Sequence, residues 1–148
     1  MRHYIFIILL QVCCYSCAQQ KVSINQLIGT KWSIKSSHDT KRTIEFHKDY
    51  YTEIAYVAFL GDTISSKREY YLSNEIPTVF DKKQKSKNKG MYIVGRTESH
   101  EHMWYYTIIS FTTQKMVLFE KAPELKEGEI AIGGQPHDIT WILERIEE

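Results

Sequence analysis

The motif His100-Glu101-His102 has the residue types and the spacing that suit a metal ion. Residues two apart share one face of a strand, so the two imidazoles could converge on one zinc or copper ion. Such a site needs a third ligand, for which His47, Glu53 and His137 are the candidates. The alternative is a polar strand start just after a turn, and we favour it. We therefore expect neither a bound metal nor a cofactor.

Five lysines lie close together between Asp81 and Gly90: Lys82, Lys83, Lys85, Lys87 and Lys89. They could bind phosphate, glycan sulfate or an acidic partner. The alternative is a solvated hairpin tip whose turn is Asn88-Lys89-Gly90, in which the lysines keep the loop soluble and the strand edges unpaired. We favour the hairpin tip.

Catalytic patterns are weak in this chain. Glu45, Asp49 and Glu53 could form paired carboxylates. We expect Glu45 and Glu53 to face outward on their strands, where solvated side chains are the ordinary outcome. The sequence has no G-x-S-x-G elbow, P-loop or dinucleotide fingerprint. We predict that the protein is not an enzyme, and keep an envelope enzyme acting on a small substrate as a third hypothesis.

Aromatic residues indicate a binding cavity instead. They make up 13% of the chain and include ten tyrosines. Because tyrosine joins an apolar ring to a polar tip, it suits a pocket for a small ligand. The candidates are Tyr50, Tyr51, Tyr56, Tyr70, Tyr71, Tyr92, Trp104, Tyr105 and Tyr106, of which we predict that Tyr56, Trp104 and Tyr106 bind ligand. The alternative is ordinary packing in the core and the outer wall.

Strands must position these side chains. Ser23 with Gln26 fits a capping box, which predicts one short helix that ends near Gly29. Trp32 and Ile34, and then Ile44 and Phe46, alternate with polar residues, as on half-buried strands. The remaining pattern predicts about eight strands with short connections, which is typical of a sandwich or barrel: 31–36, 42–46, 49–59, 67–72, 91–96, 101–112, 115–120 and 138–146. The 122–137 segment is predicted to be a loop.

The first eighteen residues hold all three cysteines of the chain. A basic start, Met1-Arg2-His3, precedes an apolar run over 4–12. This run is too short to cross a bilayer, which takes about 20 apolar residues. A basic start, a short apolar run and small residues after it are typical of an export signal.

Two processing sites compete. Cleavage after Ala18 would release a soluble protein that starts at Gln19. Alternatively, Ser16-Cys17 resembles the end of a lipobox, and Cys17 would be lipidated as the mature N-terminus. We favour lipidation of Cys17. Residues 1–18 are then the export signal and residues 19–148 a single domain without a disulfide. The net charge of +1 provides no field that would favour a nucleic-acid partner.

Two motifs carry a family resemblance: Leu27-Ile28-Gly29-Thr30-Lys31-Trp32 and Trp141-Ile142-Leu143-Glu144-Arg145. Together with the strands between them, they resemble the lipocalin-like domains of exported Bacteroidetes proteins over residues 24 to 146. The start Cys17-Ala18-Gln19-Gln20 is similar to that of many Bacteroidetes lipoproteins. The resemblance implies that Trp32 closes one end of a barrel and that Arg145 packs over its indole. The chain departs from the family's Gly-x-Trp motif by one extra residue.

We therefore expect an all-β fold: an antiparallel, up-and-down barrel of about eight strands, lipocalin-like (calycin), with a short N-terminal helix. The predicted function is to bind a small, partly apolar ligand in the barrel. The predicted location is the cell envelope, as an outer-membrane lipoprotein held by Cys17, or otherwise as a soluble periplasmic or secreted protein. The alternative is a structural or protein-interaction module whose barrel is filled by side chains.

Overall fold

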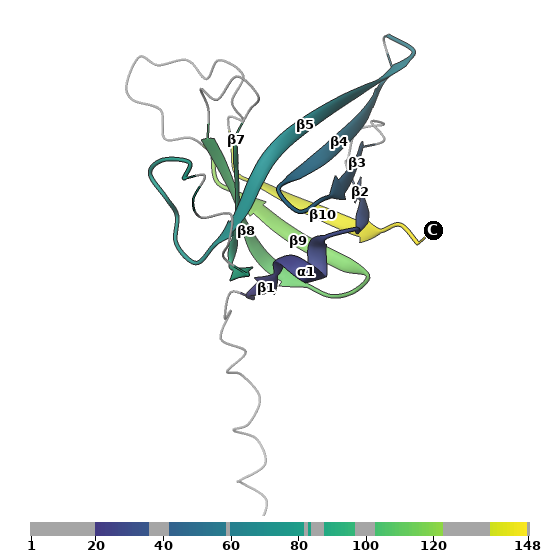
Figure 1. Ribbon diagram of the computed structural model, residues 1–148. Helices are drawn as coiled ribbons and strands as arrows, with labels where there is room; N and C mark the ends of the chain where they lie inside the picture. The colour runs from purple at the N-terminus through teal and green to yellow at the C-terminus, as the bar shows by residue number, and fades with distance from the viewer. Residues whose placement is uncertain are drawn as a thin grey trace, which may run out of the picture.

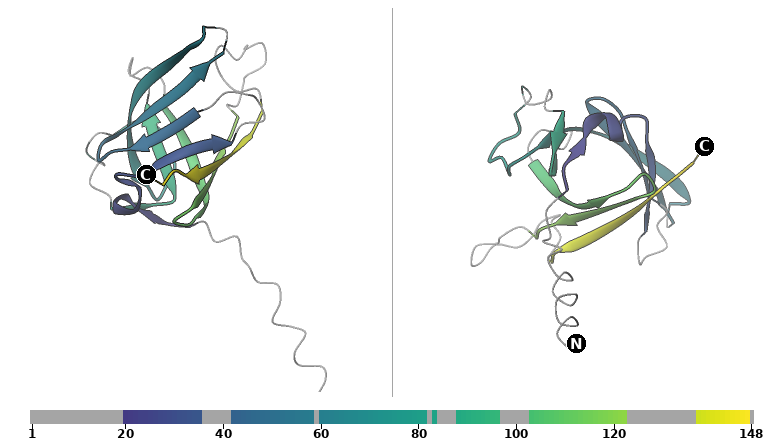
Figure 2. Two further views of the ribbon diagram at one scale, coloured as in Figure 1. Left: turned by 90° about the vertical axis from the view of Figure 1, so that its right-hand side faces the viewer. Right: turned by 90° about the horizontal axis from the view of Figure 1, so that it is seen from below.

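The computed structural model describes residues 20–35, 42–58, 60–81, 83, 88–96, 103–122 and 137–147. Within them, strands close into an antiparallel barrel in the order β10-β2-β3-β4-β5-β7-β8-β9. The barrel is seen from the side in Figure 1 and from below in the right-hand view of Figure 2. The His100-Glu101-His102 motif, the export signal, most of the lysine cluster and most of the 122–137 segment lie outside the described residues.

The elements follow the chain in this order: β1 (Val22–Ser23), α1 (Ile24–Leu27), β2 (Lys31–Lys35), β3 (Arg42–Phe46), β4 (Tyr50–Val57), β5 (Asp62–Ser73), β6 (Lys89–Gly90), β7 (Tyr92–Arg96), β8 (Met103–Phe111), β9 (Lys115–Glu120) and β10 (Ile139–Arg145). Barrel strands that follow one another in the chain are neighbours in the sheet, and β10 closes the ring by pairing with both β9 and β2. The prediction of an up-and-down antiparallel barrel with a short N-terminal helix is confirmed.

The N-terminal segment closes the lower end of the barrel. Gln26 Oε1 accepts a hydrogen bond of 2.8 Å from the Ser23 backbone N–H, which stabilises the start of α1. Gly29, at φ +75°, turns the chain from α1 toward β2. Upstream, the Gln20 amide exchanges two hydrogen bonds with the backbone of Phe111, at 2.9 and 2.6 Å. Residues 20–30 are thereby attached to the barrel.

The lower half of the barrel is a filled apolar core. Trp32 is fully buried, its Nε1 donates to Thr30 Oγ1 at 2.7 Å, and its ring packs against Phe111. The other buried apolar residues in this cluster are Val22, Leu27, Ile34, Ile44, Phe46, Tyr51, Tyr70, Leu72, Ile93, Ile108, Met116, Leu118 and Leu143. Burial of this much apolar surface stabilises the fold without a disulfide.

The hairpin of β4 and β5 is longer than its neighbours. β3 pairs with β4 only as far as Ala55, and β7 pairs with β5 only from Glu69 onward. The hairpin therefore extends beyond the barrel wall at the upper end (Figures 1 and 2). Its tip carries large apolar side chains that are 41–55% exposed: Tyr56, Leu60 and Ile64. The predicted strand over 67–72 thus starts earlier, at Asp62.

The predicted turn Asn88-Lys89-Gly90 is wrong. Lys89 and Gly90 form β6 and pair with Ser23 and Val22 of β1. Gly90 is required there because a Cβ would overlap the backbone of Ser73. The N-terminal segment supplies the strand partner: Val22 pairs with Gly90, which lies 68 residues away in the chain. A pairing this distant leaves no local signature in the sequence.

A segment after β5 covers part of the outer wall. Phe80 packs on Tyr71 at 5.1 Å between ring centroids, and the guanidinium of Arg96 lies 4.6 Å from the Phe80 ring. Arg96 also donates from Nε to Glu69 at 2.7 Å. Among the described residues, no helix is long and apolar enough to span a membrane.

Candidate functional site

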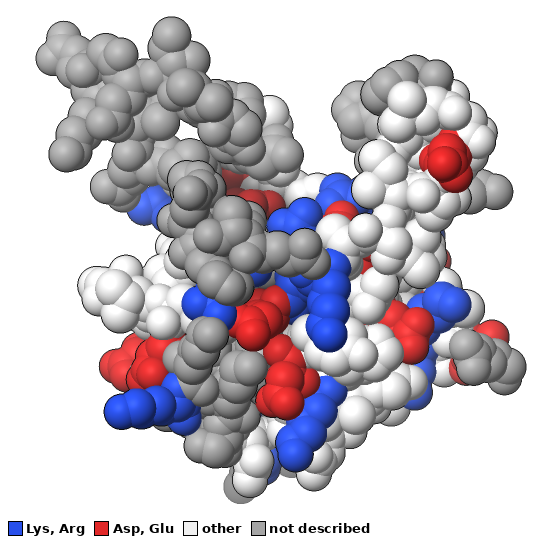
Figure 3. All heavy atoms as spheres, turned by 45° about the horizontal axis from the view of Figure 1, so that its top comes forward, with Lys and Arg blue, Asp and Glu red and all other residues white. Residues whose placement is uncertain are grey.

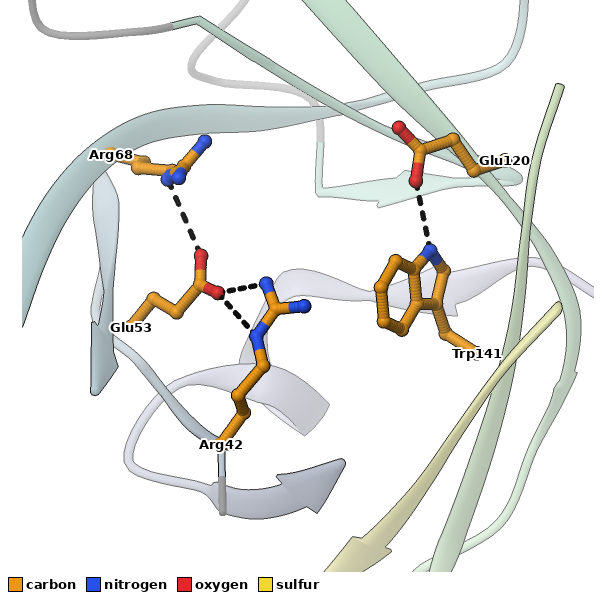
Figure 4. A network of polar contacts seen from close by, with 5 residues as sticks. All are labelled: Arg42, Glu53, Arg68, Glu120 and Trp141. Carbon is orange, nitrogen blue, oxygen red and sulfur yellow. Dashed lines mark hydrogen bonds and ion pairs between the residues drawn. The ribbon is translucent and has the colours of Figure 1, made fainter. Parts of the chain in front are cut away.

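Three charged side chains meet inside the upper half of the barrel. Arg42 of β3 donates from Nε to Glu53 of β4 at 2.9 Å, and its Nη2 forms a second contact with the same carboxylate oxygen. Arg68 of β5 forms an ion pair with the other oxygen of Glu53 at 3.4 Å. Figure 4 shows the three side chains converging from neighbouring strands.

The prediction that Glu53 faces outward into solvent is wrong. Glu53 is 8% exposed, and it pairs with Ile44, so both side chains share the inner face. The alternation of side chains along β4 could not show which of its faces is internal, because both faces carry apolar residues. A carboxylate so deeply buried needs cationic partners, which Arg42 and Arg68 provide. Glu45, by contrast, has a half-exposed side chain.

A second polar pair lies on the opposite wall. Trp141 of β10 donates from Nε1 to Glu120 of β9 at 2.9 Å. The Arg42 guanidinium lies 5.0 Å from the centre of the Trp141 ring, within the range of a cation–π contact. Arg42 thus connects the carboxylate on β4 with the indole on β10 across the interior (Figure 4).

Three aromatic side chains border the charged groups. The Trp104 ring lies 5.7 Å from that of Tyr51 and 4.8 Å from that of Tyr106. Burial raises the pKa of the Tyr51 and Tyr106 hydroxyls above the usual value. For Tyr106, the charges of Glu120 and Glu53 add to this effect, whereas the two arginines oppose it. All four charged groups thus influence the pKa of the Tyr106 hydroxyl.

Trp104 also contributes an unsatisfied hydrogen-bond donor. Its Nε1 is buried, and no described residue accepts its proton. The ring rests against Gly95 of β7, where a Cβ would overlap the indole. A buried donor without an acceptor typically costs about 1–3 kcal/mol. Such a group is a common feature of sites that complete their hydrogen bonds with a bound molecule or water.

The structure separates the predicted ligand residues. Trp104 and Tyr106 lie together on the inner face of β8. Tyr56 lies on the other face of β4 from Glu53 and is 41% exposed, so it is not part of this cluster. Sequence reasoning considered Glu53 only as a metal ligand, a paired carboxylate or a solvated side chain, and it missed Arg42 and Arg68. The local signal is that Arg42 lies two residues from buried Ile44, and Arg68 two residues from buried Tyr70, so each shares the buried face of its strand. Tyr51, one of the wider aromatic set, belongs to the cluster.

Trp32 and Arg145 occupy neighbouring positions at the lower end, since they pair across β2 and β10. Arg145 Nη1 donates to the Thr113 carbonyl at 3.4 Å. No cation–π contact between Arg145 and Trp32 occurs in the described part of the chain, where the arginine over an indole is Arg42. The role of Trp32 and Arg145 in closing the barrel stays a prediction.

No cluster of three or more potential metal ligands occurs among the described residues. Of the candidates for a third ligand, Glu53 is held by two arginines, and His47 stacks on Tyr50 at 4.4 Å. His137 is exposed. His100 and His102 lie outside the described residues, so whether they bind a metal is untested.

A surface depression at the lower end has a volume of about 500 Å³. Its lining is polar and carries charges of both signs: Gly29, Lys31, Glu45, Gln114, Arg145, Ile146 and Glu147. It is half open and has few apolar atoms to hold an organic molecule. The interior cluster combines aromatic, cationic and unsatisfied groups, so we take the cluster as the candidate site.

The upper face of the molecule shows where this site meets solvent. In Figure 3, basic and acidic side chains lie next to one another at the foot of the protruding hairpin. The side chain of Arg68 is 34% exposed, whereas that of Glu53 is 9% exposed.

Comparisons with protein-family models, with curated proteins and with solved structures find no match to this chain.

Proposed function

We propose that this chain is an exported, lipocalin-like protein that binds a small, partly apolar molecule in the upper half of its barrel. The division of the interior carries the proposal. The buried core is filled with apolar side chains, whereas Trp104, Tyr106 and Trp141, which pack against it, lie next to partly exposed charged groups. An apolar lining with a few convergent polar groups is the usual composition of a small-molecule site.

The overhang of the β4–β5 hairpin supports the proposal. Ala55 pairs with Ile64, and Val57 with Asp62, so these residues share the face of the hairpin that carries Glu53. Ile64 is 50% exposed on this face. Ala55, Val57 and Ile64 thus add apolar side chains to this face beyond the charged groups, where they would contact the apolar part of a ligand.

Native mass spectrometry tests ligand binding. The protein, purified in its native state, should carry a small molecule that organic extraction releases. Substitution of Tyr106 by Ala should reduce the occupied fraction severalfold, because it removes an aromatic wall of the site. The matched control is Tyr105→Ala, which changes a half-buried residue on the outer face of the same strand. Equal occupancy in the two variants would contradict the proposed site.

We further propose that Cys17 carries a lipid anchor. Support comes from the sequence: Ser16-Cys17 resembles the end of a lipobox, and Cys17 lies three residues before Gln20, the first residue that the structure describes. Intact-mass measurement of membrane-extracted protein should show an acylated chain that starts at Cys17. A mature chain that starts at unmodified Gln19 would disprove the anchor and would leave ligand binding as a separate question.

One observation favours a protein-interaction module as a second candidate function. The hairpin tip exposes Leu60 together with Tyr56 and Ile64, which lie on opposite faces of the hairpin, and exposed apolar side chains of this size can mark a contact surface. Under this hypothesis, Leu60→Asp would abolish capture of a partner and leave small-molecule occupancy unchanged. Under the proposed ligand function, Leu60→Asp changes occupancy less than Tyr106→Ala.

A further inference from the structure

We infer that the bound molecule presents an oxyanion (a carboxylate, sulfate or phosphate group) to Arg68 and to Nε1 of Trp104. This inference rests on the proposed ligand-binding function and specifies the chemistry of its polar contact. The relevant observation is an excess of hydrogen-bond donors over acceptors in the interior cluster.

Arg68 supplies most of this excess. Its guanidinium has five N–H donors, yet within the described residues its one polar contact is the 3.4 Å ion pair from Nε to Glu53. The two terminal amino groups therefore have no acceptor in the part of the chain that the structure describes. A planar fork of N–H groups matches the two oxygens of a carboxylate, or two oxygens of a sulfate or phosphate.

Trp104 supplies a second free donor near the first. Tyr51 connects the two residues: it pairs with Arg68 across β4 and β5, and its ring contacts that of Trp104. The buried Nε1 of Trp104 can donate but cannot accept, so it selects an acceptor as its partner. A ligand oxygen satisfies it, whereas a ligand ammonium group does not.

Most carboxylate oxygens of the cluster are engaged: both oxygens of Glu53 and one oxygen of Glu120. Arg42 donates twice to one oxygen of Glu53, and Arg68 lies next to the other. Glu120 accepts from Trp141. The four formal charges of Arg42, Arg68, Glu53 and Glu120 cancel, but the wall formed by β3, β4 and β5 has two cations against one anion. An oxyanion at Arg68 balances that wall, and a cation would add to its excess.

Isothermal titration calorimetry tests the inference with probes that share a naphthalene ring and differ in their head group. The probes are 2-naphthylacetate, 2-naphthyl sulfate, 2-naphthyl phosphate, neutral 2-naphthaleneethanol and cationic 2-naphthylmethylammonium, titrated into the purified full-length protein. At least one anionic probe should bind tenfold or more tightly than the alcohol, because hydrogen bonds to a charged group are stronger than those to a neutral one. The order among the three anions identifies the type of oxyanion.

Three variants locate the effect. Arg68→Gln and Trp104→Phe should each reduce the preference for the anion over the alcohol by about threefold or more. Lys67→Gln is the matched control: it removes a positive charge from the adjacent residue, which lies on the opposite face of β5 over Tyr50. It should leave the preference unchanged. Circular dichroism shows that each variant is folded.

The possible results distinguish failure of the oxyanion inference from failure of the proposed ligand-binding function. Equal binding of anion and alcohol would overturn the oxyanion inference and retain the proposed small-molecule site. An anion preference that Lys67→Gln abolishes and Arg68→Gln does not would also overturn it, because the preference would then arise from the outer surface. Failure of every probe to bind at millimolar concentration would count against both proposals.

Discussion

The indole of Trp104 on β8 lies directly against Gly95 of the paired strand β7, in the space that any larger residue would fill. A Cβ at Gly95 would overlap the six-membered part of the ring. This close approach places Trp104 beside Tyr51 and Tyr106. Gly95 therefore controls the position of one wall of the proposed ligand site.

Gly95→Ala should destabilise the protein by about 1–3 kcal/mol, because the added methyl group displaces Trp104 from a packed interior. Urea unfolding followed by tryptophan fluorescence measures the loss. The comparison is Gly61→Ala. Gly61 has φ +63°, and a Cβ there would meet nothing within 4 Å. This variant therefore measures only the strain of a non-glycine residue at positive φ, about 1 kcal/mol. A loss at Gly95 no greater than that at Gly61 would contradict the steric argument.

Glu53→Gln should lower the free energy of unfolding by about 2–4 kcal/mol. The change removes the charge that neutralises Arg42 and Arg68 inside the barrel. Both arginines are about one-third exposed, so solvent compensates part of the loss. The control is Glu144→Gln, which breaks the exposed pair with Lys35 and should cost at most about 0.5 kcal/mol. Similar losses in both variants would place Glu53 in solvent.

The stability of the protein should fall as the pH rises above about 10. Burial raises the pKa of the hydroxyls of Tyr51, Tyr70 and Tyr106 in the folded state. In that range the unfolded chain loses protons that the folded chain retains, so unfolding becomes more favourable. Each such tyrosine contributes a slope of up to about 1.4 kcal/mol per pH unit.

Tyr106→Phe should reduce this alkaline slope, because phenylalanine has no proton to lose. Urea unfolding at a series of pH values between neutral and strongly alkaline measures the slope, and tyrosinate absorbance follows ionisation directly. Tyr105→Phe, on the outer face of β8, is the matched control for loss of a hydroxyl. An unchanged slope in Tyr106→Phe would show that this hydroxyl ionises equally in the folded and unfolded chains.

Gln20→Ala should loosen the start of the N-terminal segment, residues 20 and 21, while the pairing of β1 with β6 holds the rest. Its side chain makes two hydrogen bonds with the Phe111 backbone, so the loss is about 1–2 kcal/mol of local stability. Trypsin should then cleave after Lys21 severalfold faster, as peptide mapping would show. Asn25→Ala, at an exposed position of α1, is the control and should leave the rate unchanged. Equal rates in both variants would show that the Gln20 contacts do not hold the segment.

Local patterns in the sequence were sufficient to predict the strands and the short helix, whereas the choice of a barrel over a sandwich came from the family resemblance. Trp32, Ile34, Ile44 and Phe46 alternate with polar residues, and all four are buried. Such alternation is produced by any strand with one face in a core, so it is readable without knowledge of the partner strand. The capping pair Ser23 and Gln26 is likewise a contact within a few residues.

Other features depended on the closed barrel. The sequence alone identified the residues that share a face of each strand, because side-chain alternation is a local property of the backbone. It did not identify which face of β4 is internal, since apolar residues lie on both. The tertiary structure decided that Glu53 faces inward with Arg42 and Arg68, and that Arg42 reaches Trp141 of β10. Such contacts exist only when distant strands pair and the ring closes, which no short stretch of sequence can encode.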